Sequence, residues 1–161
     1  MAYDPQRGGG RGYGQRKRRS DRPNTPYDQL QPIEPENLPI NYVNEAERVM
    51  KDLREKNESG RFSITTSKIR AIHTLVMDIY NTEHLRTEAE LLEESQLKLM
   101  RLYVRIVYDA GREQAVTTFL ETTKLLNYIK GIGNSRAEMI RFAHYMEALV
   151  AYHRFMGGKE N

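Results

Sequence analysis

A hydroxyl-rich helix start within the stretch "SITTSKIR" has the residue types of a phosphate-binding site. Free backbone amides and the positive end of a helix dipole favour an anion at such a start. Lys68 and Arg70 add positive charge within the first turn. They project from well-separated sides of the helix, so one phosphate is not expected to contact both. The alternative is an N-cap followed by two solvated cations. The hydroxyl-bearing residues are Thr65, Thr66 and Ser67.

A second candidate site is a basic stripe that could follow the backbone of a polyanion. Lys98, Arg101 and Arg105 recur at i, i+3 and i+7, and Arg112 lies a further turn away beyond Asp109. Such a stripe can equally be a solvent-facing edge whose cations pair with glutamates of a neighbouring helix. A third, smaller candidate is a pair on one face of the last predicted helix, Arg141 and His144.

No residue pattern typical of catalysis or of metal binding stands out. The chain has no cysteine, which excludes a disulfide framework, a thiolate zinc site and a cysteine nucleophile. The histidines lack the i, i+4 spacing of a helical zinc site, and no phosphate-binding loop or nucleophile elbow occurs. We therefore expect no enzymatic activity, no metal, no cofactor and no small-molecule substrate. The four histidines are His73, His84, His144 and His153.

The stretch "KGIGNSRAEM", residues 130–139, matches the helix-hairpin-helix motif that holds DNA phosphates. Its two glycines, Gly131 and Gly133, would let backbone amides approach a phosphate, with Ile132 anchoring the hairpin. A glycine at a helix end followed by Asn-Ser at the next helix start is also what a tight turn between two helices uses. We interpret the stretch as a turn, and a sequence-nonspecific DNA-binding hairpin is the alternative.

The elements that must position these residues are helices. Apolar residues recur at helical spacing along the chain after Pro39, and no alternating strand pattern competes. The sequence therefore predicts an all-α fold, a compact five-helix bundle preceded by a disordered basic N-terminal tail. The third helix, apolar on most sides, is expected to be the central one. The five expected helices span residues 43–57, 66–81, 87–110, 112–130 and 134–156.

The tail and the helical domain differ in charge. Residues 1–22 hold seven basic and two acidic residues, whereas the rest of the chain holds 18 basic and 20 acidic residues. We predict a disordered Arg/Gly-rich tail and a Pro-rich linker over residues 1–40, and one domain over residues 41–161. The tail is either a nucleic-acid tether or a solubilising extension. No apolar run is long enough to cross a membrane, and we expect a cytoplasmic protein.

Three ordered blocks resemble the small subunit of the type III-A CRISPR effector, the Csm complex. They are "TTSKIR" at 65–70, "YDAGRE" at 108–113 and "YMEALVAYHRFMGGK" at 145–159. The resemblance covers roughly residues 41–159, and the tail, the linker and "KGIGNSRAEM" lie outside its pattern.

The resemblance implies a non-catalytic, helical RNA-binding subunit of an antiviral ribonucleoprotein. Copies of such a subunit stack in a filament and contact the sugar-phosphate backbone of guide RNA paired with target RNA. The implied partners are these RNAs, the other subunits of the complex and further copies of the chain. By motif match, Lys68, Arg70 and Arg112 are contact candidates, followed by Arg141 with His144. The DNA-binding hairpin and a purely helical protein-interaction module stay open as alternatives.

Overall fold

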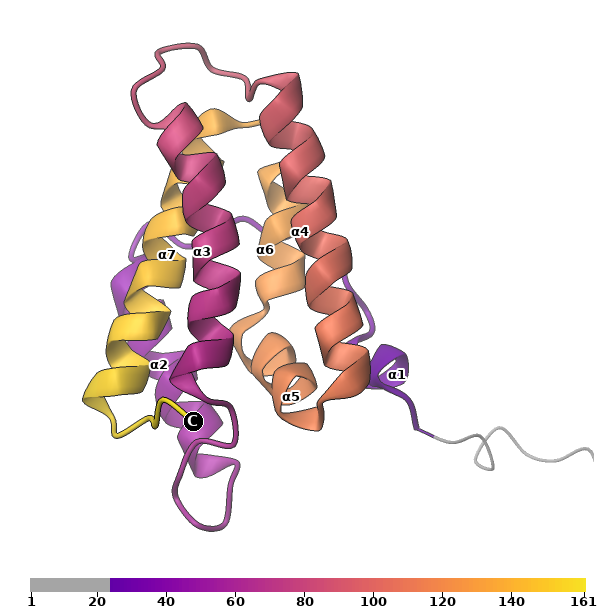
Figure 1. Ribbon diagram of the computed structural model, residues 1–161, viewed down its shortest axis with the longest axis vertical. Coiled ribbons are helices and arrows are strands. Elements are labelled where there is room, and N and C mark those ends of the chain that lie inside the picture. The colour runs from indigo at the N-terminus through magenta and orange to yellow at the C-terminus, as the bar shows by residue number, and fades with distance from the viewer. Residues whose placement is uncertain (1–23) are drawn as a thin grey trace, which may run out of the picture.

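The computed structural model describes residues 24–161, and helices make up most of this range (Figure 1). The predicted all-α class is confirmed, but the expected count of five helices is wrong, because the described range contains seven helices and no strand. The helices are α1 (Pro26–Leu30), α2 (Tyr42–Glu55), α3 (Thr66–Glu83), α4 (Glu93–Arg112), α5 (Gln114–Thr123), α6 (Leu125–Ile132) and α7 (Arg136–Phe155).

The core forms around α7, which packs along both α2 and α3, while α4 packs against α3 and α5 (Figure 1). The expectation that the third predicted helix is central is therefore wrong. Its counterpart α4 buries only one face, so apolar side chains such as Met100 and Val104 remain exposed. On α7 the buried side chains cover a broad face, an arc of about 160° at about 100° per residue. They are Met139, Phe142, Ala143, Tyr145, Met146, Leu149 and His153.

Two predicted boundaries differ from the structure for local reasons. The third helix was expected from residue 87 but α4 begins at Glu93, because residues 84–92 form a loop between α3 and α4. The fourth was expected to be continuous but is broken into α5 and α6 at Lys124, whose backbone adopts a left-handed conformation with φ of 54°. A left-handed residue ends the α-helical hydrogen-bond pattern there.

The described part of the Pro-rich segment, residues 24–40, contacts the helical body along much of the segment's length. Thr25 and Asp28 form a capping box that begins α1. The extended residues that follow run along α6, where the Asn127 amide donates a hydrogen bond to the Glu34 carbonyl at 3.0 Å and Leu38 is buried. The predicted disorder of the basic tail falls on residues outside the described range, and the domain boundary at residue 40 stays a prediction.

Candidate nucleic-acid interface

The start of α3, one of the candidate phosphate sites, is already occupied by the chain itself. The N–H of Thr66 donates to the carbonyl of Lys159 at 2.8 Å, and the N–H of Ser67 donates to the carbonyl of Glu160 at 3.3 Å. Thr65 is the N-cap, and its side chain accepts a hydrogen bond from the N–H of Lys68. The expectation of free amides and hydroxyls for an anion is therefore wrong, because backbone carbonyls fill that position.

A buried histidine of α7 joins the same helix start. His153 lies 3.0 Å through Nδ1 from the Thr66 hydroxyl and 3.0 Å through Nε2 from the carbonyl of Ile64. A carbonyl only accepts, so Nε2 donates and Nδ1 of the neutral ring accepts from Thr66. Burial lowers the pKa of His153, which favours this neutral form. We call His153 and residues 158–160 the clasp.

The glycine of the clasp has a steric role. A Cβ atom at Gly158 would lie 2.2 Å from the ring of His153 and 2.6 Å from its backbone carbonyl. Only glycine allows the chain to fold this closely over the ring. The "GGK" block therefore has a structural explanation within the described chain.

The two cations at the start of α3 both form ion pairs with distant residues. Lys68 pairs with Glu113 at the junction of α4 and α5, and Arg70 pairs with Glu160 of the clasp at 3.3 Å. The structure thus brings the "TTSKIR" and "YDAGRE" blocks together. All four side chains are about half exposed, so neither pair contributes much to stability. An incoming phosphate could exchange for either carboxylate.

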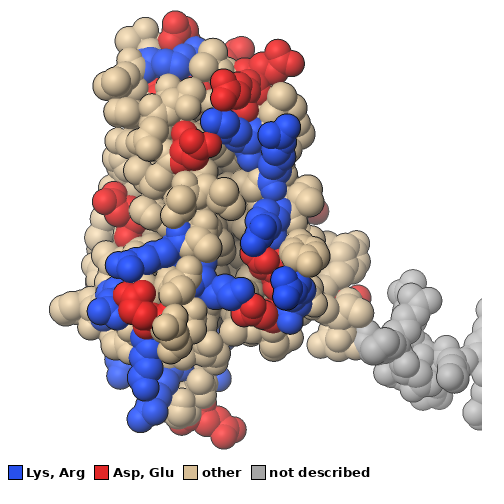
Figure 2. Space-filling model, in the orientation of Figure 1, with Lys and Arg blue, Asp and Glu red and all other residues tan. Residues whose placement is uncertain are grey.

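The basic stripe lies on the exposed side of α4, where Lys and Arg side chains follow the helix (Figure 2). Arg105 pairs with Asp109 at 3.2 Å, and Lys98 bridges to Asp78 of α3 at 3.0 Å. Arg101 forms no ion pair with any residue in the range 24–161. A groove between α3 and α4 is lined by Leu75, Asp78, Lys98, Arg101, Leu102 and Arg105.

Arg112, at the end of α4, is held by an aromatic ring instead of a carboxylate. Its guanidinium carbon lies 5.5 Å from the centre of the Tyr108 ring, and both side chains belong to exposed residues. This cation–π contact orients the guanidinium without neutralising its charge. Among the described residues Arg112 has no acidic partner, so it and Arg101 are the stripe's two uncompensated cations.

Arg141 and His144 lie apart from this stripe. Arg141 pairs with Glu138 on the same helix at 2.8 Å. The His144 ring faces Tyr42 of α2 and Tyr80 of α3, with ring centroids 6.1 Å and 5.6 Å away. Both residues of α7 are half-buried. The structure therefore brings five of the seven predicted site residues to α3 and α4 and separates these two from them.

Sequence reasoning missed an exposed apolar stripe beside the basic one. At about 100° per residue, the cations of α4 span an arc of about 60°, and the exposed apolar residues span the adjoining arc. The buried face lies opposite. Val104 is 68% exposed and Met100 is 58% exposed. A helical projection could have found this stripe. Its members are Leu97, Met100, Val104, Val107 and Tyr108.

The "KGIGNSRAEM" stretch bonds to two other segments of this chain. A Cβ atom at Gly131 would lie 1.8 Å from the carbonyl oxygen of Glu36, so this glycine accommodates the Pro-rich segment. The N–H of Arg136 donates to the carbonyl of Ala89 at 2.9 Å, and the carbonyl of Asn134 accepts from Leu91 at 2.8 Å. These contacts fit the turn interpretation, because they join the stretch to the Pro-rich segment and to the loop between α3 and α4.

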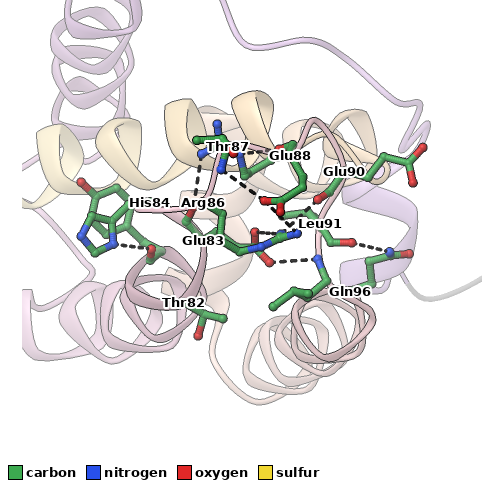
Figure 3. Close-up of polar contacts among 12 residues, drawn as sticks. Thr82, Glu83, His84, Arg86, Thr87, Glu88, Glu90, Leu91 and Gln96 are labelled. Carbon is green, nitrogen blue, oxygen red and sulfur yellow. Dashed lines mark hydrogen bonds and ion pairs between the residues drawn. The ribbon is translucent and has the colours of Figure 1, made fainter.

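A buried acid at the other end of α3 also escaped sequence reasoning (Figure 3). The Glu83 side chain is fully buried, where it contacts Arg86 and accepts a hydrogen bond from the N–H of Leu92 at 3.0 Å. Burial alone would raise the pKa of this carboxyl. The neighbouring Ser95 hydroxyl, Arg86 and the Leu92 N–H outweigh burial and lower it. We call Glu83 and its partners Arg86 and Leu92 the acid junction.

The acid junction fixes the loop between α3 and α4. From α7, the Arg136 guanidinium donates to the carbonyls of Glu88 at 2.7 Å and Glu83 at 3.2 Å. Because every oxygen of the Glu83 carboxylate has a donor, the group is a structural anion.

No helix within residues 24–161 combines the length and the apolarity needed to cross a membrane.

Comparison of the sequence with known proteins places this chain in a family. Residues 40–159 match the family model described as Csm2 Type III-A. A Streptococcus thermophilus protein named "CRISPR system Cms protein Csm2" is 41% identical over 120 residues, which are 74% of this chain and 94% of that protein. The protein of the same name from Mycobacterium tuberculosis is 37% identical over 119 residues, with the same two shares. That from Enterococcus italicus is 36% identical over 117 residues, 70% of this chain and 82% of that protein.

Proposed function

Because the chain belongs to the Csm2 family and is thus the small subunit of a type III-A CRISPR effector, we propose that its α4 face binds RNA. The RNA is the guide strand and its paired target, contacted through the sugar-phosphate backbone. The protein acts in antiviral defence as part of a cytoplasmic ribonucleoprotein. Base pairing reads the sequence, so the subunit needs only positive charge at the right spacing.

One observation carries this proposal: Arg101 and Arg112 remain without a carboxylate on an exposed helix. Most cations of α3 and α4 are paired within the described chain, whereas these two are not. An uncompensated guanidinium on a solvent-facing helix is suited to a phosphate, which it can contact through two parallel hydrogen bonds. The half-exposed pairs of Lys68 and Arg105 would supply further cations when a phosphate displaces their carboxylates.

The exposed apolar stripe of α4 supports assembly of several copies in a filament. A stripe that adjoins the basic one would lie against a neighbouring subunit when the basic one lies against RNA. Exposed apolar patches of this kind mark protein–protein contact sites. The same proposal includes the other subunits of the effector as partners.

We propose further that the subunit is not catalytic. Its buried acid is fully engaged with Arg86 and Leu92, and its buried histidine with Thr66 and Ile64. Neither group is open to a substrate. The role of the chain is then to position RNA and its neighbours, with no small-molecule substrate.

The test of RNA binding uses the reconstituted effector carrying Arg101→Gln and Arg112→Gln. Each lost phosphate contact should lower the slope of log affinity against log salt by about 0.7 to 0.9, so target RNA binding should weaken and its slope should fall by about 1.5. The matched control, Lys51→Gln with Arg61→Gln, removes the same charge from α2 and the loop after it. Equal slopes for the two double variants would reject the α4 face.

The test of assembly uses Val104→Asp, with Val43→Asp on α2 as its control. Both valines are exposed, so neither change should unfold the protein. We expect Val104→Asp to lower the number of copies per complex, measured by native mass spectrometry, because a carboxylate would be buried at the contact. An unchanged copy number with Val104→Asp would remove this stripe from the filament contact.

A further inference from the structure

The two ends of the helical body carry opposite charge. One end consists of the loop between α3 and α4 and the start of α7, where residues 83–94 and 134–138 hold six acidic and two basic residues. The other end consists of the loop between α2 and α3, the start of α3 and the end of α7. There, residues 54–70 and 151–161 hold seven basic and three acidic residues. We call these regions, with formal charges of −4 and +4, the acidic end and the basic end.

The acidic end and the basic end lie at opposite extremes of the long axis (Figure 1). Helix α3 joins them, and its 18 residues span about 27 Å. Helix α7 runs antiparallel to α3, because Arg136 in its first turn donates to the carbonyl of Glu83 at 3.2 Å, whereas His153 in its last turn contacts Thr66. This separation exceeds the screening length of about 8 Å at physiological salt. The charges of the two ends therefore do not compensate each other within one copy.

Each end also combines an exposed apolar side chain with two charges that lack a partner. Leu85 at the acidic end is 83% exposed, and Phe155 at the basic end is 85% exposed. Four exposed charged side chains form no ion pair with any residue in the range 24–161. They are Glu90 and Glu93 at the acidic end, and Arg61 and Lys159 at the basic end. An exposed apolar group among unpaired charges of one sign is suited to a protein surface of the opposite sign.

A second copy of this chain is the partner that fits both ends. An acidic end against a basic end brings unlike charges together, whereas two identical ends would bring together charges of one sign. A contact between two different surfaces can continue from copy to copy, whereas a surface that contacts itself closes as a dimer. The exposed stripe of α4 is a single surface, so a continuing stack of copies needs a complementary pair of surfaces as well.

We propose that the acidic end of one copy contacts the basic end of the next copy, with Leu85 and Phe155 buried in the contact. This inference rests on the assembly of copies proposed above, and it assigns the two surfaces and the direction of the stack. All copies in such a stack point the same way. Because α4 packs along α3 on the same long axis, the basic stripes of successive copies would follow one another in a line (Figure 1).

The experiment measures self-association of the purified full chain by sedimentation velocity at low and at high salt. One variant reverses the acidic end with Glu90→Lys and Glu93→Lys, a second reverses the basic end with Arg61→Glu and Lys159→Glu, and a third carries all four changes. Each two-site variant should weaken self-association at least about tenfold, because ends of like charge then meet. The four-site variant should regain it, because its ends are again complementary. Salt should weaken association of the parent chain by screening the same charges.

The matched control places the same kinds of change away from both ends. Lys51→Glu on α2 and Glu147→Lys on α7 reverse one charge of each sign at exposed positions, so this variant should associate like the parent. All the substituted side chains are exposed, so none of the changes should unfold the protein. Circular dichroism checks this, and the single changes Glu93→Lys and Arg61→Glu replace any two-site variant that loses helicity.

Each other outcome overturns the proposal. A parent chain that stays monomeric at low salt rejects it, as does a two-site variant that associates like the parent or a control that loses as much. Failure of the four-site variant to recover shows that the two ends do not meet. Val104→Asp is measured in parallel: an effect of that variant alone would reject the ends, whereas an effect of the end variants alone would reject only the α4 stripe as a contact between copies. RNA binding through Arg101 and Arg112 is tested separately by its salt slope.

Discussion

Charged and polar side chains are buried at the two ends of α3, whereas they are exposed on the outer face of α4. At the acid junction and the clasp, charged and polar groups are buried and each has a partner. The partners of Glu83 are the nearby Arg86 and Leu92, whereas those of His153 lie about ninety positions away. On α4, cations and apolar side chains alike stay open to solvent. Burying a polar group is tolerated only when the fold supplies its partner. The difference teaches that the buried polar groups of α3 find their partners within the described chain, whereas the outer face of α4 stays open, as the proposed RNA and subunit contacts require.

The largest effect should come from breaking the acid junction. Glu83→Gln leaves Arg86 and the N–H of Leu92 without their buried anion, so we expect unfolding free energy to fall by about 3 kcal/mol. The matched control is Glu88→Gln in the same loop, whose exposed carboxylate also contacts Arg86 and should cost less than about 0.5 kcal/mol. Chemical denaturation checks both. Equal losses for the two variants would contradict a buried structural anion.

Two leucines, one buried and one exposed on α4, extend the comparison to apolar side chains. Leu38 in the Pro-rich segment is 5% exposed, and Leu97 on α4 is 45% exposed. We expect Leu38→Ala to cost about 2 kcal/mol and Leu97→Ala to cost close to zero. Thermal unfolding measures the two. A negligible effect of Leu38→Ala would show that the Pro-rich segment does not contribute to the stability of the body.

Acid should loosen the clasp before it affects α4. Burial lowers the pKa of His153 below its ordinary value of 6.5, with the Ile64 carbonyl opposing this shift, Arg154 adding to it and Glu160 opposing it. The stability from the neutral ring is present above pH 6.5 and is lost as pH falls through the lower folded value. We expect His153→Phe to flatten the decline in unfolding free energy between pH 7 and 5. Burial also lowers the pKa of His73, so this residue should retain part of the decline in unfolding free energy with falling pH.

The smallest effect concerns the half-exposed ion pair that joins the two sequence blocks. A double-mutant cycle of Lys68→Gln and Glu113→Gln should give a coupling free energy of no more than about 1 kcal/mol. This coupling should shrink further at high salt, because exposed pairs are screened. A coupling well above that value, independent of salt, would place Lys68 with the buried junctions and would argue against its release to RNA.

Local patterns predicted most of the helical body because its buried faces follow the helical period. Val49 and Met50 of α2, and Ile69 and Ile72 of α3, are buried at the expected spacing. The start of α4 could not be placed, because acidic residues at 88 and 90 are equally suited to a first helical turn and to an exposed loop. What decides between them is Glu83, whose hydrogen bond to residue 92 is a tertiary contact.

The sequence predicted which cations form the candidate site, but not which of them lack an acidic partner in the folded chain. The spacing of Arg101 and Arg105 gave the stripe, and the motif blocks gave Lys68 and Arg112. Their partners lie far along the chain, as Glu113 does from Lys68 and Glu160 from Arg70. No local pattern encodes such pairs. The clasp was missed for the same reason, since it joins residues about ninety positions apart.

The clasp also sets the order in which the protein can be completed during synthesis. The first amides of α3 receive their carbonyls from residues 159 and 160, and the hydroxyl of Thr66 waits for His153. A nascent chain that has emerged from the ribosome only as far as α6 therefore holds α3 with a frayed first turn. The first turn of α3 therefore gains its full set of hydrogen bonds only after residues 153–160 have been made.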